Sequence, residues 1–150
     1  MKSREYPERP LIGIGVVVLG PKKVLMIQRG KPPRAGGWSL PGGAQKLGET
    51  IYEAAYREVR EETGIEVEVV GLIDVVDSIH RDGAGAVQYH YTLIDVLARP
   101  SCGVLAVGGD ATDVKWAALH ELASLGLWLE TERVIQLGVE MAETIPDWGI

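Results

Sequence analysis

Three glutamates on one short stretch of the chain have the spacing of a metal-binding face. Glu58, Glu61 and Glu62 stand at positions i, i+3 and i+4, which share a narrow arc of one face if the segment is helical. Three carboxylates in such an arc repel one another, so a helix carries them either as a solvated acidic face or around a bound cation. Their oxygen atoms suit Mg²⁺ or Mn²⁺, which share a few carboxylates with waters and substrate phosphates.

The neighbouring residues favour the bound cation over the solvated face. Arg57 precedes Glu61 by four residues and can brace its carboxylate as an i,i+4 partner. Pro41-Gly42-Gly43 permits a tight turn whose carbonyl oxygens can join a metal site, because glycine lets the backbone approach a ligand closely. We therefore predict a divalent-metal site built from the three glutamates and this turn.

Composition and charge limit the partners that the chain can have. Its 150 residues, 46% hydrophobic and 24% charged, are enough for one domain with a buried core. The net charge of −6 repels bare polyanions, so we expect neither a nucleic acid nor an anionic membrane as a partner. A phosphate-containing ligand would need something other than bulk charge to attract it, and a bound divalent cation would serve.

The sequence carries no sign of export or of a membrane span. The first ten residues, MKSREYPERP, have no apolar run behind their charges, and the apolar stretch 11–19 is too short to cross a bilayer. The single cysteine, Cys102, excludes an internal disulfide. We expect a cytoplasmic protein, and the sequence leaves open whether it forms a homodimer.

Local patterns predict the elements that position the glutamates. Thr50 and Glu53 form a capping box at the start of their helix, and Gly64 is a C-terminal cap at its end. Gly20-Pro21-Lys22 separates two β-rich segments and predicts a hairpin. The remaining predictions are strands at 11–19, 23–29, 38–40, 66–76, 87–97 and 114–118, loops at 77–86 and 99–112, a helical turn at 120–125 and a helix at 130–143.

The order of these elements predicts the fold class. No repeat or linker divides the chain, so we expect one domain over residues 11–145, with a flexible N-terminal arm at 1–10 and a tail at 146–150. Helices are few and widely placed among strands that are mostly joined by hairpins. This arrangement predicts an α+β fold with a mixed β-sheet and helices packed on its faces.

The stretch from Gly43 to Ile65 resembles the signature of the Nudix hydrolases. That signature reads Gly-x5-Glu-x7-Arg-Glu-U-x-Glu-Glu-x-Gly-U, with U a bulky aliphatic residue, and the chain departs from it nowhere. Nine matches at fixed spacing arise by chance in roughly one chain in ten million. The matching residues are Gly43, Glu49, Arg57, Glu58, Val59, Glu61, Glu62, Gly64 and Ile65.

The resemblance implies a Nudix-type α/β/α sandwich that hydrolyses a nucleoside diphosphate linked to another moiety. It implies that the three glutamates hold Mg²⁺ or Mn²⁺ with help from a backbone carbonyl at Gly42 or Gly43. It also implies that Glu49 and Arg57 orient the metal-binding carboxylates. Bound metals neutralise a pyrophosphate and lower the pKa of a bound water, which agrees with such a reaction.

Some Nudix hydrolases take their general base from the signature helix and others from an acid in a later loop. The Gly-rich loop before the last predicted strand offers Asp110 and Asp113. We prefer Asp110, because it lies among glycines in a flexible segment. The alternative is that both are solvated loop acids or turn formers.

Four side chains are candidates for contacts with the substrate. Arg29 and Arg34 flank a Gly-Lys-Pro-Pro loop and can clamp phosphates, or they are ordinary surface arginines. Trp38 can stack on a base, with a core or rim position as the alternative. His80 is expected in a loop after a strand, where substrate contacts often originate, and simple solvation is its alternative.

Features outside the signature bear on the substrate. The short chain, the segment GGWSLPGG and the late strand HYTLIDVLA are most similar to small bacterial proteins grouped with ADP-ribose pyrophosphatases. This resemblance implies a nucleotide sugar such as ADP-ribose. Two alternatives remain, a mutator-type nucleoside triphosphate pyrophosphohydrolase and a non-catalytic nucleotide-binding Nudix domain.

Overall fold

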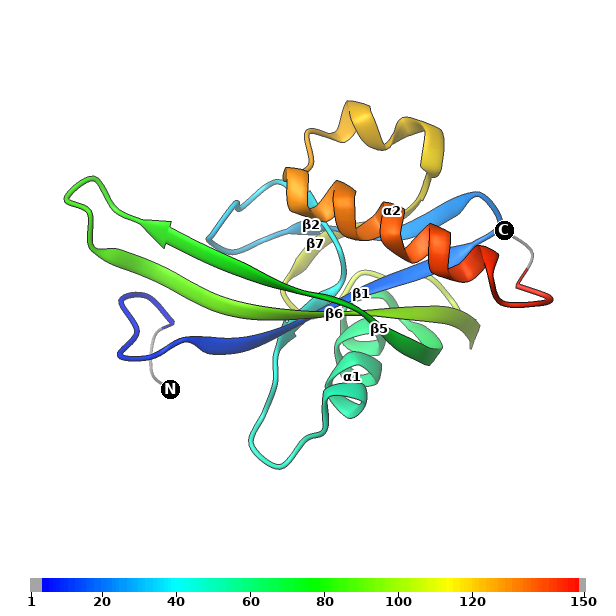
Figure 1. Ribbon diagram of the computed structural model, residues 1–150, viewed down its shortest axis with the longest axis horizontal. Helices are drawn as coiled ribbons and strands as arrows, with labels where there is room; N and C mark the ends of the chain where they lie inside the picture. Colours follow the sequence, from blue (N-terminus) through cyan, green and yellow to red (C-terminus); the bar gives the residue numbers. More distant parts are fainter. Residues whose placement is uncertain (1–3, 149–150) are drawn as a thin grey trace.

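The computed structural model describes residues 4–148, which form a seven-stranded sheet with an α-helix on each face (Figure 1). The strand order is β3-β2-β1-β6-β5, with β4 paired to β1 and β7 paired to β2. The elements are β1 (Leu11–Gly20), β2 (Lys23–Arg29), β3 (Trp38–Ser39), β4 (Gly42–Ala44), α1 (Ile51–Thr63), β5 (Ile65–Arg81), β6 (Val87–Gly103), β7 (Ala111–Ala118), the 3-10 helix η1 (Leu119–Leu125) and α2 (Leu129–Glu143).

Strand β1 joins the two halves of the sheet. It runs parallel to β6 along most of its length, antiparallel to β4 at Gly13–Gly15, and antiparallel to β2 only at Leu19 and Gly20. The sheet is therefore mixed, as the sequence predicts. In one half of the sheet, β1 pairs with β4 and β6, and β6 pairs with β5. In the other half, β2 pairs with β3 and β7.

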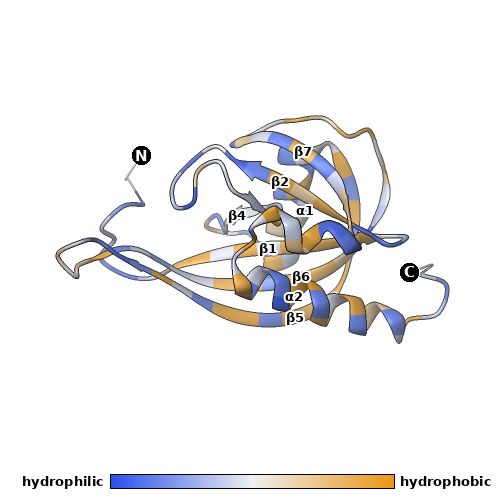
Figure 2. Ribbon diagram, turned by 90° about the horizontal axis from the view of Figure 1, so that it is seen from above, coloured by the Kyte–Doolittle hydropathy of each residue, from blue (hydrophilic) through white to orange (hydrophobic). Residues whose placement is uncertain are grey.

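Both faces of β1 are buried, which explains its uninterrupted apolar run. Val17 and Leu19 belong to the core under α2, whereas Val16 and Val18 belong to the core under α1. Alternate side chains of a strand point to opposite faces, so one strand supplies both cores. Figure 1 shows α2 above the strands and α1 below them, and Figure 2 shows hydrophobic and hydrophilic residues alternating along α2. In the part of the chain that the structure describes, no helix has the length and apolarity needed to cross a membrane.

Helix α1 begins and ends where the capping residues predict. The Thr50 hydroxyl accepts a hydrogen bond from the Glu53 amide at 3.1 Å, and the Glu53 carboxylate accepts one from the Thr50 amide at 3.1 Å. Gly64 ends the helix with φ of 75°, and its amide donates to the Arg60 carbonyl. These caps fix the register of the helix and thereby the face on which its glutamates stand.

The β5–β6 hairpin is longer than predicted. The expected loop at 77–86 is wrong, because β5 continues to Arg81 and only residues 82–86 turn. The Asp82 carboxylate accepts hydrogen bonds from the amides of Ala84 and Ala86, and this tight turn lets the flanking polar residues pair as strands. The expected irregular segment at 99–112 is also too long, since β6 extends to Gly103 against the start of β5.

The N-terminal arm lies against this hairpin. It has no helix or strand between residues 4 and 10, and Tyr6 attaches it through its amide to the Gln88 carbonyl and through its hydroxyl to Asp82, both at 2.7 Å. The Tyr89 hydroxyl donates to the Glu5 carboxylate at 3.1 Å. These contacts place Arg4 beside the hairpin. Residues 1–3 of the expected arm and 149–150 of the expected tail lie outside the described residues.

Candidate active site

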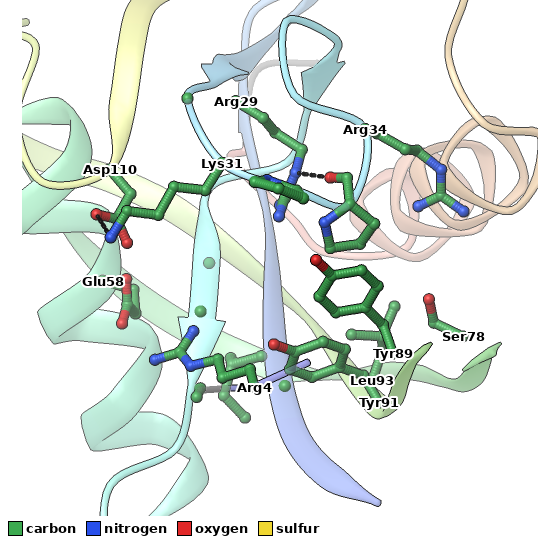
Figure 3. A pocket seen from close by; sticks show the side chains of 18 of the residues that line it. Arg4, Arg29, Lys31, Arg34, Glu58, Ser78, Tyr89, Tyr91, Leu93 and Asp110 are labelled. Carbon is green, nitrogen blue, oxygen red and sulfur yellow. Dashed lines mark hydrogen bonds and ion pairs between the residues drawn. The ribbon is translucent and has the colours of Figure 1, made fainter. Parts of the chain in front are cut away.

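A cavity of about 750 Å³ lies where β1, β4, α1 and the loop after β2 meet (Figure 3). The acids Glu58 and Asp110 stand on one side of it, and Arg34, Tyr89 and Ser78 stand on the other. The cavity therefore has an acidic end, where Lys31 also reaches Asp110, and an aromatic end with Arg34. Its basic side chains are Arg4, Arg29, Lys31 and Arg34.

Glu62 is the most deeply buried acid of the cavity. It is 4% exposed, and its Oε1 accepts a hydrogen bond from the Gly42 amide at 2.7 Å. Burial is the largest of the causes that together raise the pKa of Glu62 to about 8; the charges of Glu58 and Asp110 also raise it, whereas the Gly42 amide and the charge of Arg29 lower it. At neutral pH this carboxyl carries a proton that a cation bound there would displace.

The β4 backbone lies directly against the carboxylates of α1. A Cβ atom added to Gly43 would stand 2.6 Å from the Glu58 carboxylate, and one added to Gly42 would stand 1.9 Å from the Ile14 carbonyl oxygen. Only glycine permits this approach. The predicted closeness of the Gly42-Gly43 backbone to the signature glutamates is thus present in the structure.

Arg57 connects several parts of the site. Its guanidinium donates to both oxygens of Glu49, to Oε1 of Glu58 at 2.7 Å and to the Ala44 carbonyl at 3.1 Å. The hydrogen bonds from Arg57, and then the one from the Lys46 amide, lower the pKa of Glu49 to about 2. These bonds with carboxylates raise the pKa of Arg57 above its usual value. Arg57 therefore holds Glu58 and ties the loop before α1 to the helix.

Glu61 stands apart from the other two signature glutamates. Its side chain is 46% exposed and lies 3.4 Å from an Arg57 nitrogen, as the i,i+4 spacing predicts. It does not line the cavity. Within residues 4–148, no three acidic, histidine or cysteine side chains form a ready-made metal group. The donors at hand are nevertheless carboxylate and backbone oxygens, the chemistry that a hard divalent cation requires.

The structure separates the two candidates for the general base. Asp110 lines the cavity and forms an ion pair with Lys31 at 3.0 Å. Asp113 lies in β7, where its carboxylate accepts a hydrogen bond from the Val114 amide, and it does not line the cavity. The two acids are only three residues apart, but Asp110 alone of the pair faces the acidic end.

The candidate substrate contacts divide in the same way. Arg29 and Arg34 line the cavity, whereas Trp38 and His80 do not. Trp38 packs against the core under α2 with the Lys115 ammonium 4.7 Å from its ring centre. The expectation that His80 lies in a loop is wrong, because it belongs to β5 and contacts the edge of the Tyr89 ring.

Sequence reasoning missed several residues of the cavity wall. Tyr89, Tyr91 and Leu93 alternate along β6 and therefore face the same side of the sheet. That alternation is visible in the sequence and could have identified them. Arg4 gave no such signal, because its place depends on how the arm attaches to the hairpin.

Comparisons with known proteins identify the family. The model of the NUDIX domain matches residues 9–137. An ADP-ribose pyrophosphatase of Methanocaldococcus jannaschii is 33% identical over 127 residues, which are 85% of this chain and 72% of that protein. The 8-oxo-dGDP phosphatase NUDT18 of Mus musculus is 43% identical over 89 residues, but these are 59% of this chain and only 25% of that protein.

Solved structures agree with the sequence comparisons. The crystal structure of a MutT NUDIX hydrolase from Burkholderia pseudomallei is 32% identical, with a TM-score of 0.74 over 87% of this chain and 98% of that one. The shared fold places the signature helix and the β4 turn at one cavity, as the resemblance implies. Since the family model spans most of the chain and relatives above 30% identity cover it, this chain belongs to the Nudix hydrolase family.

Proposed function

We propose that the chain is a Mg²⁺- or Mn²⁺-dependent pyrophosphohydrolase that cleaves a nucleotide sugar such as ADP-ribose. The observation that carries this proposal is one cavity with carboxylates at one end, tyrosines and Arg34 at the other, and further basic side chains between them. A substrate with a central pyrophosphate and two organic ends fits such a cavity, whose volume of about 750 Å³ lies in the range of small-molecule sites. The Methanocaldococcus jannaschii relative carries the name of this activity.

The acidic end would hold the metal. Glu58 and Glu62 offer carboxylates inside the cavity, a carbonyl of Gly42 or Gly43 is beside them, and Glu61 would join by turning from the surface. A divalent cation there neutralises the pyrophosphate and acidifies a water.

Basic side chains of the chain would orient the metal ligands and bind the phosphates of the substrate. Arg57 keeps Glu58 oriented, and Arg29, whose Nε is held by the Pro33 carbonyl at 2.8 Å, presents its guanidinium to a phosphate. Arg34 and Lys31 add positive charge along the cavity. An acidic protein thereby attracts an anionic substrate locally.

Asp110 accepts the proton of the attacking water in this proposal. We expect Asp110→Asn to lower kcat by about 10²-fold with a much smaller change in KM, because general-base catalysis contributes 10²- to 10⁴-fold. Steady-state kinetics on ADP-ribose with saturating Mg²⁺ measure the two constants. Asp113→Asn, which removes the same charge outside the cavity, is the matched control. A rise confined to KM would assign Asp110 to substrate positioning instead.

The raised pKa of Glu62 predicts that metal affinity depends on pH. A metal that binds this carboxylate displaces its proton, so the affinity rises with pH and levels off near pH 8, with a slope of at most about tenfold per pH unit. Calorimetric titration of Mn²⁺ at several pH values between 6 and 9 measures this dependence. In Glu62→Gln the slope should vanish, and a wild-type affinity that stays flat over this range would contradict the assignment.

Phosphate release across a panel of nucleotides tests the function as a whole. The panel contains ADP-ribose, other nucleotide sugars, dinucleotides and triphosphates, with Mg²⁺ or Mn²⁺ and an EDTA control. We expect the highest kcat/KM for ADP-ribose and none of the activity in EDTA. A preference for triphosphates would favour the mutator-type activity, which the Burkholderia pseudomallei MutT neighbour supports. Nucleotide binding without any hydrolysis would favour a non-catalytic binding domain.

A further inference from the structure

A second cavity, of about 80 Å³, adjoins the large one. Arg34 and Leu93 line both, so the two spaces are neighbours. The small cavity lies between β1, β6 and the start of α2, where Asp95 and Trp128 also line it. Figure 3 places Arg34 across the large cavity from Glu58 and Asp110. The small cavity therefore extends the site at the end opposite the signature glutamates.

Asp95 is a buried acid without a partner. It is 5% exposed, and its carboxylate forms no hydrogen bond or ion pair with any residue from 4 to 148. Its Oδ1 fills the space beside Gly15, where an added Cβ would stand 2.1 Å away. Burial raises the pKa of this carboxyl to about 7. Among residues 4–148, Arg99 Nε is the one fully buried polar side-chain atom without a hydrogen-bond partner, so the Asp95 oxygens are reached from the small cavity and need a donor there, from water or from a ligand.

The neighbouring charges do not satisfy Asp95. Arg133 of α2 is the nearby cation, but it forms ion pairs with Asp74 at 2.9 Å and with Glu130 at 2.6 Å. The charge of Asp74 adds to the effect of burial on the Asp95 carboxyl, and the charge of Arg133 offsets it only in part. Asp95 is thus left with an acceptor directed into the small cavity.

The walls of the small cavity suit a flat, largely apolar group. Leu40, Val76 and Leu93 are apolar, and the Trp128 ring is covered by the Arg34 guanidinium at 4.1 Å. The other polar side chains of the lining are Arg34, which covers Trp128, Glu130, which pairs with Arg133 at 2.6 Å, and Thr131. Asp95 is therefore the lining carboxylate that no basic side chain of residues 4–148 pairs with. A heterocycle lying over Leu93 needs only one polar partner at its edge. An exocyclic amino group at that edge is small enough for a space of 80 Å³.

We propose that Asp95 determines substrate specificity by accepting a hydrogen bond from an exocyclic amino group of the substrate's nucleobase. The inference rests on the proposed function, because it places the pyrophosphate of the same substrate at the acidic end. It adds the recognition of the base to that function. Asp95 is absent from the Nudix signature, so the hydrolytic residues and the base-reading residue are separate.

Binding of non-hydrolysable ligands tests this proposal. The ligands are α,β-methylene diphosphates in three pairs that differ by one amino group: adenosine against purine riboside, guanosine against inosine, and cytidine against zebularine. We expect the wild type to prefer the amino-bearing member of at least one pair by at least about tenfold in Kd, the size of a hydrogen bond to a charged group. Asp95→Leu should reduce this preference to below about twofold, since the carboxylate that accepts the hydrogen bond in this proposal is removed.

Two further variants keep the test decisive. Asp95→Asn retains the shape and one acceptor but loses the charge, so its preference should lie between those of the wild type and Asp95→Leu. Asp77→Asn removes an exposed charge of the neighbouring strand β5 that lines neither cavity, and it should keep the wild-type preference. Thermal unfolding of each variant confirms that it is folded.

The results separate this proposal from the hydrolytic one. A wild type that discriminates less than about twofold in all three pairs overturns the role of Asp95, as does a folded Asp95→Leu that keeps the full preference. If Asp95→Leu does not fold, an undiminished preference in Asp95→Asn overturns it. Because these ligands are not cleaved, the outcome is the same whether or not the protein hydrolyses nucleotide sugars.

Discussion

Replacing Glu62 by glutamine is expected to lower kcat by about 10³-fold, the largest loss from any single change of charge in the site. The carboxylate of Glu62 lies inside the cavity, is 4% exposed, and would contact the metal directly. Glutamine offers a neutral amide oxygen in its place, which holds a divalent cation weakly. The measurement is kcat on ADP-ribose at saturating Mg²⁺.

The same substitution should leave the fold intact. The amide oxygen of glutamine can still accept the hydrogen bond from the Gly42 amide, and burial already favours the neutral form of Glu62 below about pH 8. We therefore expect the melting temperature in EDTA to be equal to or above that of the wild type. Glu140→Gln, the same change on an exposed position of α2, is the control for the loss of charge. Unchanged turnover of Glu62→Gln in Mg²⁺ would exclude Glu62 as a metal ligand.

The parts of the site that the sequence predicts are those encoded locally. The caps at Thr50 and Gly64 and the spacing of the glutamates lie within one helix, so they do not depend on tertiary contacts. The closeness of Gly43 to that helix is already a long-range feature. The resemblance to a known signature predicts this closeness, which no local pattern indicates.

The parts that the sequence does not predict depend on strand register. The extension of β5 to Arg81 arises from pairing with Val87 across the Asp82 turn, and the residues involved look like a polar loop when read alone. In the sequence Asp95 is a single acid within an apolar strand, and no local pattern indicates that it will pair with Gly15 of β1. The small cavity is set by that pairing and by the position of α2, so no local pattern identifies it.

The second large effect is expected from a change at Arg57, which forms hydrogen bonds with both Glu49 and Glu58. We expect Arg57→Lys to weaken metal affinity or lower kcat by about 10- to 100-fold, as changes behind a metal site commonly do. Arginine donates along several directions of a rigid plane, whereas a lysine ammonium cannot hold Glu49, Glu58 and the Ala44 carbonyl together. The measurements are Mn²⁺ affinity by calorimetry and kcat as a function of Mn²⁺ concentration. Arg60→Lys, an exposed arginine of the same helix, is the control.

If Arg57 is a positioning residue, a further prediction follows for Glu49. If Glu49 acts only by fixing the Arg57 guanidinium, then Glu49→Gln should weaken Mn²⁺ affinity in the wild-type background but add little to Arg57→Lys, because the bond between them is already lost. High Mn²⁺ should restore part of the kcat of both single variants, since their glutamate ligands remain. Losses that simply add in the double variant would mean that Glu49 acts on the metal or substrate independently, and a wild-type affinity in Arg57→Lys would exclude the positioning role altogether.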